Sequence, residues 1–410
     1  MSVRTDQSEP DRIILKAAVE APTAGLGSRD KRALWAAVAI WVLPMLVVAF
    51  MVIAQPMKRT VTPVYHDAVT HWWEGTKLYG RSTAFKYLPH FAPLFTPFHA
   101  LPRPWGDVLW RLGAAALLAT GLWRALRLQF GSEAPRVFLW ASVLTVPLSL
   151  AALRNGQANA LFSALTLHAT ACLPRQQWWT ATVLAVLAVA VKPIGVVLVL
   201  LAPFVYPALR WRLALAVFVL AVFPFVLRSP EYVLEQHGEF LENLRVSVAV
   251  TGHQFADIHG ILRTFGTELP SSTSTVVRVL TGAATLALWW LGSRRLREPA
   301  QAMWLHALTA SYLMLFNPMN EENAYVILAP ALAFWAMCLL TKVTTRPLGW
   351  AVVFMALSMG LLPNVLRPLS GNSFALFWHP VMTLLFVSLL AQYHWRQGSR
   401  AAPTGPMYLT

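Results

Sequence analysis

The chain has 410 residues, of which 57% are hydrophobic and only 12% are charged. So few charged side chains cannot build a surface exposed to water, which excludes an ordinary soluble protein and indicates an integral membrane protein. Its 33 Lys and Arg against 18 Asp and Glu give a net charge of +15, but the basic residues lie in short clusters between long apolar runs, so the excess does not indicate nucleic-acid binding.

The apolar runs predict an all-α, polytopic membrane protein. A helix satisfies its own backbone hydrogen bonds in lipid, and it needs about 20 apolar residues to cross a bilayer. We expect twelve spans, near residues 34–55, 107–126, 136–153, 158–174, 177–191, 193–209, 213–228, 275–292, 300–317, 323–341, 347–364 and 374–393. The chain then divides into a tail (1–33), one membrane domain (34–393) and a second tail (394–410).

Basic residues predict which face each connection occupies. Cytoplasmic connections are enriched in Lys and Arg, and alternate connections carry basic clusters here, from Arg29, Lys31 and Arg32 to Arg396 and Arg400. Both tails are therefore expected in the cytoplasm. The outer face is expected to hold the remaining connections, in which polar residues concentrate: 56–106, 154–159, Lys192, 229–274, 318–322 and 365–373.

The first outer connection contains a candidate general base. Asp67, His71 and Glu74 recur at helical spacing within residues 64–79, which predicts a short helix on the outer membrane surface with Trp72 toward lipid. A carboxylate beside an apolar wall suits a general base, because desolvation raises its pKa toward the working range. Asp67 is the first candidate; the alternative is a carboxylate that only stabilises the first turn of a helix.

Segment 85–104 follows and is apolar, but it contains five prolines. Proline interrupts a helix interior, so we expect the segment to be re-entrant or to lie along the interface rather than to span. Irregular backbone at membrane depth is tolerated where it lines a cavity. Tyr87 is therefore a candidate substrate-binding residue, and an ordinary interfacial loop is the alternative.

Two polar interruptions of apolar sequence are further candidates for substrate binding. Arg154, Gln157 and Asn159 stand at the start of a predicted span, where amides suit sugar hydroxyls and arginine suits phosphate. Lys192 separates two short apolar stretches, where a charge is costly unless it meets an anion. Simpler roles also fit: the amides could link helices, and Lys192 could extend its amine to the membrane surface.

The last outer candidates are Glu321 and Glu322, which begin an otherwise uncharged span. They could position an acceptor hydroxyl, or balance the charges of Lys192 and Arg154, or simply stabilise a helix start. The two cysteines show no paired spacing, and no compact metal-ligand motif occurs, so the sequence predicts no disulfide, no metal and no cofactor.

The order of these features resembles glycosyltransferase family 87, a family of GT-C fold membrane enzymes. The matching residues are Asp67, Tyr87 with Pro89, Gly156-Gln157-Ala158-Asn159, Lys192-Pro193, and Asn317-Pro318 leading to Tyr325. The resemblance implies metal-independent transfer of a hexose, typically mannose, from a polyprenyl phosphate to a lipid or glycan hydroxyl at the outer face of a bacterial inner membrane. Its partners would be the donor, the acceptor and membrane lipids, without nucleic acid.

The resemblance also implies roles for individual residues. Asp67 would take the acceptor proton, Arg154 and Lys192 would compensate the donor phosphate, and Gln157 and Asn159 would hold the sugar or backbone groups. Family members commonly carry His or an aromatic residue where this chain has Glu321 and Glu322, which is a departure from the pattern. A transporter or lipid flippase is the alternative function, although the two halves of the chain do not match and the polar groups gather at one face.

Overall fold

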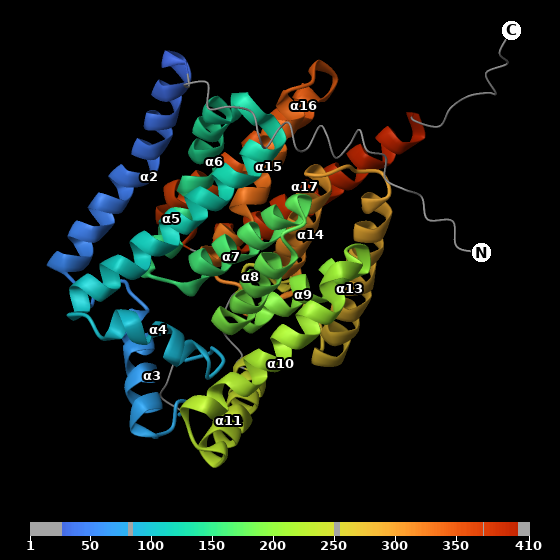
Figure 1. Cartoon of the computed structure of the whole chain (residues 1–410). Helices are drawn as coiled ribbons and strands as arrows, with labels where there is room; N and C mark the ends of the chain where they lie inside the picture. Colours follow the sequence, from blue (N-terminus) through green and yellow to red (C-terminus); the bar gives the residue numbers. More distant parts are fainter. Residues whose placement is uncertain (1–26, 81–84, 250–254, 372, 401–410) are drawn as a thin grey trace, which may run out of the picture.

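A computed structural model describes residues 27–80, 85–249, 255–371 and 373–400, so most of both predicted tails lies outside the described residues. All regular secondary structure in these ranges is helical (Figure 1). The α-helices are α2 (Ser28–Ala54), α3 (Thr62–Glu74), α4 (Phe91–His99), α5 (Arg103–Phe130), α6 (Ala134–Asn155), α7 (Ala158–Cys172), α8 (Trp178–Val191), α9 (Val196–Val205), α10 (Arg210–Leu227), α11 (Pro230–Ala249), α12 (Ile258–Thr264), α13 (Ser271–Ser293), α14 (Ala300–Phe316), α15 (Ala329–Leu340), α16 (Arg346–Ser370) and α17 (Ser373–Arg400). Of the short 3-10 helices, η5 (Glu322–Ile327) precedes α15.

All twelve predicted segments coincide with helices, but twelve spans are not confirmed. Six stretches are long and apolar enough to cross a membrane: Ser28–Ala54, Arg103–Asn155 (which contains both α5 and α6), Pro207–Leu227, Ser271–Ser293, Val343–Ser370 and Ser373–Arg396. Helices α7, α8, α9, α14 and α15 have 10 to 17 residues, fewer than the roughly 20 that span a bilayer. The most buried of them, α7 and α15, are surrounded by protein, so their hydrophobicity reflects packing against other helices.

Contacts between connections agree with the predicted alternation of faces. Connections assigned to the outer face meet one another through Val61 N–Asn155 O (3.0 Å), Ala256 N–Asn320 O (2.7 Å) and Lys77–Glu239 (3.1 Å). Those assigned to the inner face meet through Arg136–Asp30 (2.9 Å) and Arg295 Nη1–Trp395 O (3.2 Å). In Figure 1, α3, α4 and α11 gather at the end of the bundle opposite the start of α2. Which end faces the cytoplasm stays a prediction.

Helices α3 and α4 lie outside the spanning bundle. The predicted short helix after the first span is confirmed as α3, but the expectation that Trp72 faces lipid is wrong. Trp72 is fully buried because α11 and the end of α10 lie against it: the Tyr232 ring of α11 lies 5.6 Å away, and Arg228, at the end of α10, donates to the Trp72 carbonyl (2.7 Å). In the proline-rich segment, α4 has nine residues, about 14 Å of helix, which is too short to cross a bilayer, as predicted.

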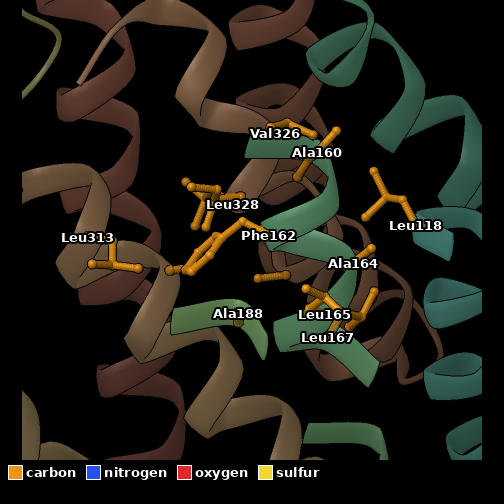
Figure 2. Packing of buried hydrophobic residues seen from close by; sticks show 14 of the residues in the cluster. Leu118, Ala160, Phe162, Ala164, Leu165, Leu167, Ala188, Leu313, Val326 and Leu328 are labelled. Carbon is orange, nitrogen blue, oxygen red and sulfur yellow. The ribbon is translucent and has the colours of Figure 1, made fainter. Parts of the chain in front are cut away.

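Helix α7 is the centre of the packed core and packs against α5, α8, α14 and η5. All of its residues except Leu161 and His168 are buried. Figure 2 shows Phe162 filling the space between neighbouring helices, while Ala160 and Ala164 allow those helices to approach closely. Because α7 is fixed along its whole length, the residues at its outer end have defined positions.

We expect Phe162→Ala to lower the thermal stability of the protein in detergent. Removing a fully buried phenylalanine leaves a cavity and costs about 3–5 kcal/mol. Phe50→Ala is the control, because Phe50 is 72% exposed in α2 and leaves no cavity. Thermal denaturation, followed by aggregation, would give the melting temperature of both variants. An equal decrease in melting temperature would show that α7 is not the packed centre.

Candidate functional site

The corner between α6 and α7, which is assigned to the outer face, is built on Gly156. This residue ends α6 with a left-handed φ of +67°, and α7 begins two residues later. Arg111 of α5 packs directly beneath it and is almost fully buried. Its guanidinium donates to the carbonyls of Arg154 (3.1 Å) and Asp107 (2.8 Å) and to the Thr60 hydroxyl (2.7 Å). The corner is therefore held in place by a buried cation, each of whose three nitrogens donates one hydrogen bond to it.

A chain of hydrogen bonds crosses this corner. Lys192 Nζ donates to Asn159 Oδ1 (2.6 Å), Asn159 Nδ2 donates to Gln157 Oε1 (2.9 Å), and Gln157 Nε2 donates to Glu321 Oε2 (2.9 Å). A positive and a negative group end the chain, and Glu321 is the charged neighbour of Lys192. Four residues selected from the sequence, from three separate outer connections, thus meet in one network.

Tyr87 joins the same corner through a second tyrosine. The Tyr65 and Tyr87 hydroxyls are 2.8 Å apart, and the Ala158 N–H at the start of α7 donates to Tyr65 (3.2 Å). Burial raises the pKa of Tyr87 to about 12; the charge of Glu321 contributes to this rise, and the hydrogen bond with Tyr65 opposes it. Tyr87 is therefore a neutral hydroxyl beside the network. Its partner Tyr65 was not identified from the sequence.

A cavity of about 920 Å³ opens next to the network. One wall is apolar and comes from α2, α6 and α16, with Pro44, Val48, Pro147 and Leu150 among its residues. Its polar end contains Arg154, Asn155, Glu321, Glu322, Asn364 and Arg367. The cavity therefore combines a surface for hydrocarbon with a cluster of charged groups, and Glu321 links it to the hydrogen-bonded network.

Arginines dominate the electrostatics at the polar end. The like charges of Arg59 and Arg367 act on Arg154, so its guanidinium is repelled by two others. Glu322 pairs with Arg367 (2.7 Å), while the buried Nε of Arg154 has no hydrogen-bond partner among the described residues. A guanidinium with a free buried donor in a cluster of like charges is suited to bind an anion such as phosphate.

Asp67 is not part of this arrangement. It lies on the exposed side of α3, whereas Tyr65 and His66 lie on the buried side, and it lines neither this cavity nor the smaller one that adjoins it. The buried carboxylate beneath α3 is instead Asp107 of α5, which accepts from Thr62 (2.7 Å) and contacts His66 (3.0 Å). The predicted role of Asp67 as general base stays a prediction.

Comparison with known proteins identifies the family. The model of glycosyltransferase family 87 matches residues 85–319, more than half of the chain. This chain belongs to glycosyltransferase family 87. No curated protein matches it. The protein is therefore a membrane glycosyltransferase with a donor and an acceptor substrate. The matched region contains Tyr87, the 154–159 corner and Lys192, whereas Asp67 precedes it and Glu321 follows it.

Sequence reasoning missed several charged residues of this family 87 enzyme. Arg59 and Arg367 lie on connections assigned to the outer face, where basic residues should be scarce. Their presence there was a sequence signal for a functional role. Asp107 and Arg111 are charges at helical spacing in a predicted span, which usually marks a paired or functional group. Both signals were present in the sequence, but neither shows which residues would meet.

We expect Gly156→Ala to destabilise the family 87 enzyme more than Gly75→Ala. Both glycines have a left-handed backbone, with φ and ψ of +67° and 27° at Gly156 and of +74° and 24° at Gly75, which an alanine adopts at a cost of about 1–2 kcal/mol. Only Gly156 is crowded: an added Cβ would lie 2.8 Å from Arg111 Cζ, whereas the nearest atom to one on Gly75 is Arg228 Nη2 at 3.7 Å, an ordinary contact. Overpacking should add about 1–3 kcal/mol at Gly156. Thermal denaturation measures the difference in stability between the two variants. An equal decrease in melting temperature would contradict a corner that Arg111 holds in place.

Proposed function

We propose that this GT-C type enzyme transfers a hexose, preferentially mannose, from a polyprenyl phosphate to a hydroxyl of a lipid or glycan acceptor. The reaction would take place at the outer face of a bacterial inner membrane, with both tails in the cytoplasm. The observation that carries the proposal is the 920 Å³ cavity, because it joins an apolar wall to a cluster of arginines. A long hydrocarbon attached to a phosphate has the same two parts.

The apolar wall is suited to a polyprenyl chain that enters from the bilayer. It extends along α6 from Arg154 back to Pro147, two helical turns or about 10 Å. Val47 of α2 and Leu361 of α16 line the cavity and are 59% and 50% exposed, so its edges face outward between these two helices. Helices α6 and α16 are in direct contact at the floor of the cavity, since a Cβ added to Gly360 would lie 2.9 Å from the Pro147 Cβ. A lipid-borne donor needs such a lateral opening.

The polar end supplies what the transfer requires. The acceptor oxygen attacks the anomeric carbon, the bond from that carbon to the phosphate oxygen breaks, and polyprenyl phosphate leaves with the bonding electrons. Arg154 and Arg367 would stabilise the negative charge that develops on the departing phosphate. Gln157 and Asn159 present amides for sugar hydroxyls, and Lys192 would hold Asn159 in place while adding positive charge to the corner.

Glu321 is the carboxylate best placed to take the acceptor proton. A general base must lie within hydrogen-bond reach of the proton that it removes. Glu321 lines the cavity, and only its Oε2 is bonded within the described part of the chain, which leaves Oε1 to accept from a substrate. Glu322 is engaged by Arg367, and Asp67 lies outside the cavity. We therefore propose Glu321 as the base in place of the sequence candidate Asp67.

Two isosteric substitutions test which of these two carboxylates, Glu321 or Asp67, is the general base. Glu321→Gln should lower kcat/KM by about 10²-fold or more, because general base catalysis contributes about 10²–10⁴-fold. Asp67→Asn should keep more than a tenth of the activity. Glu235→Gln is the control, since Glu235 is an outer-face carboxylate that pairs with Lys77. If Asp67→Asn abolishes transfer while Glu321→Gln retains it, the base is Asp67 and the proposed role of Glu321 is wrong.

The reaction itself is tested with purified protein in lipid, radiolabelled polyprenyl-phosphate-mannose and a membrane lipid extract as acceptor. We expect label to pass covalently to an acceptor, more slowly from the glucose analogue, and equally well in the presence of a metal chelator. Uptake of the labelled sugar into sealed vesicles without a covalent product would instead support the transporter alternative and overturn the proposed function.

A further inference from the structure

Two histidines, His66 of α3 and His99 of α4, face each other on the side assigned to the outside, and they line neither cavity. Their Nδ1 atoms are 3.0 Å apart, and the centroids of their rings are 5.2 Å apart. We propose that this histidine pair holds α3 in position for the transfer at neutral pH and releases it in acid. The inference rests on the proposed function, because it concerns the regulation of the same site.

The hydrogen bonds of His66 limit the charge that the pair can hold. Asp107 of α5 is fully buried, and its Oδ1 lies 3.0 Å from His66 Nε2, so this nitrogen donates to the carboxylate. The two Nδ1 atoms can then share one hydrogen, because one nitrogen donates and the other accepts. The pair can therefore carry one positive charge and keep its bond. With a second positive charge both Nδ1 atoms carry a hydrogen, neither can accept, and the bond breaks.

The charged groups around His99 place this second step in acid. They are His66 and Asp67 on α3 and Arg103 at the start of α5. Burial of the ring lowers the pKa of His99 below its ordinary value of 6.5; the charges of His66 and Arg103 contribute to this shift, and Asp67 opposes it. The bond is therefore intact at neutral pH. Because the unfolded chain takes up this proton more readily than the folded protein, stability falls as the pH drops below 6.5.

The pair fixes the end of α4 against α3. His99 is the last residue of this nine-residue helix. Phe91 and Phe95 of α4 pack edge-on against the Tyr65 ring of α3, with centroids 4.7 and 5.3 Å away. The Tyr65 hydroxyl accepts from the Ala158 N–H at the start of α7 (3.2 Å). A shift of α4 therefore changes the packing of a tyrosine that contacts the helix end proposed to bind the sugar.

The other side of the His66 ring is connected to the same corner. Asp107, which His66 contacts, accepts from the Thr62 hydroxyl (2.7 Å). The Thr62 and Thr60 hydroxyls are 2.9 Å apart, and Arg111, the cation beneath the corner, donates to Thr60 (2.7 Å). The histidine pair thus joins α4 to a continuous run of hydrogen bonds that ends at the corner. Loss of its bond frees α3 on the side of α4.

The pH dependence of transfer by the full-length protein tests this inference. His99→Asn replaces the ring with a neutral amide that can still donate to His66 and does not titrate. We expect this variant to keep the kcat/KM of the parent protein at neutral pH. At about pH 5 it should exceed the parent about 10-fold, as expected for one hydrogen bond to a charged group. Protonation of the proposed base Glu321 slows both proteins alike, so the ratio of their activities isolates the histidine pair.

His71→Asn is the control. His71 lies on the same helix, but its ring contacts the Thr76 hydroxyl (2.7 Å) instead of a second histidine. This variant should lose activity in acid as the parent protein does. Identical pH profiles for the parent protein and His99→Asn would overturn the inference. His99→Gln, which carries the same amide on a longer side chain, is the second variant if His99→Asn is unstable at neutral pH.

Thermal denaturation at neutral and acid pH separates this inference from the proposed function, because it needs no substrate. Acid should lower the melting temperature of the parent protein and of His71→Asn more than that of His99→Asn. If it does so but no labelled product forms, the histidine pair stands and the proposed glycosyl transfer fails. If transfer proceeds and acid affects all three proteins alike, the function stands and the histidine pair fails. A difference in melting temperature without a difference in activity would contradict the role of the pair in positioning α3 for the transfer.

Discussion

Two amides at the start of the buried helix α7 and a lysine at the break between α8 and α9 have to find partners, because an unpaired polar group in apolar surroundings costs about 2–7 kcal/mol. The hydrogen-bonded chain from Lys192 through Asn159 and Gln157 to Glu321 meets this requirement. It ties together the break between α8 and α9, the start of α7 and the corner before η5. The same chain holds one oxygen of Glu321, which lines the cavity, so a structural requirement of the core also positions the carboxylate that we propose as the general base.

The cations are arranged around a second buried group. Arg111 lies beneath Gly156 and donates to the Arg154 carbonyl and to the Thr60 hydroxyl, so it fixes the end of α6 and the loop after α2 at the same time. Arg154 therefore emerges where two cavities meet, with Arg59 and Arg367 as its charged neighbours. Charges that repel one another are retained at such a point when an anion offsets the repulsion. The apolar wall beside the larger cavity supports our proposal that its anion is carried by a lipid.

Hydropathy predicted where the helices are, but not how deep they lie. Alanine and leucine in α7 have the same hydropathy whether lipid or protein surrounds them, so hydropathy does not show which of the short core helices cross the membrane. The alternation of basic connections grouped Gln157, Asn159, Lys192 and Glu321 on one face, and the structure brings these four together. Helical spacing predicted α3, but not its rotation: Tyr65 and Asp67 are two residues apart and point about 200° apart around the helix, so the tyrosine enters the core and the carboxylate is exposed. The roles of Arg59 and Arg367 depend on contacts between distant connections, which no local pattern encodes.

The central claim is that a lipid phosphate occupies the cavity formed by α2, α6 and α16. Photocrosslinking tests it most directly, with a polyprenyl-phosphate sugar that carries a diazirine on its first isoprene units and with peptide mapping of the labelled protein. The account predicts crosslinks on α2 around Pro44 and Val48 and on α16 around Gly360, competed by unlabelled donor. A fully apolar groove between α8 and α10, lined by Val183, Leu187 and Val219, offers the probe another surface. The account would be contradicted if the crosslinks that unlabelled donor suppresses lay only in that groove, with none on α2, α6 or α16.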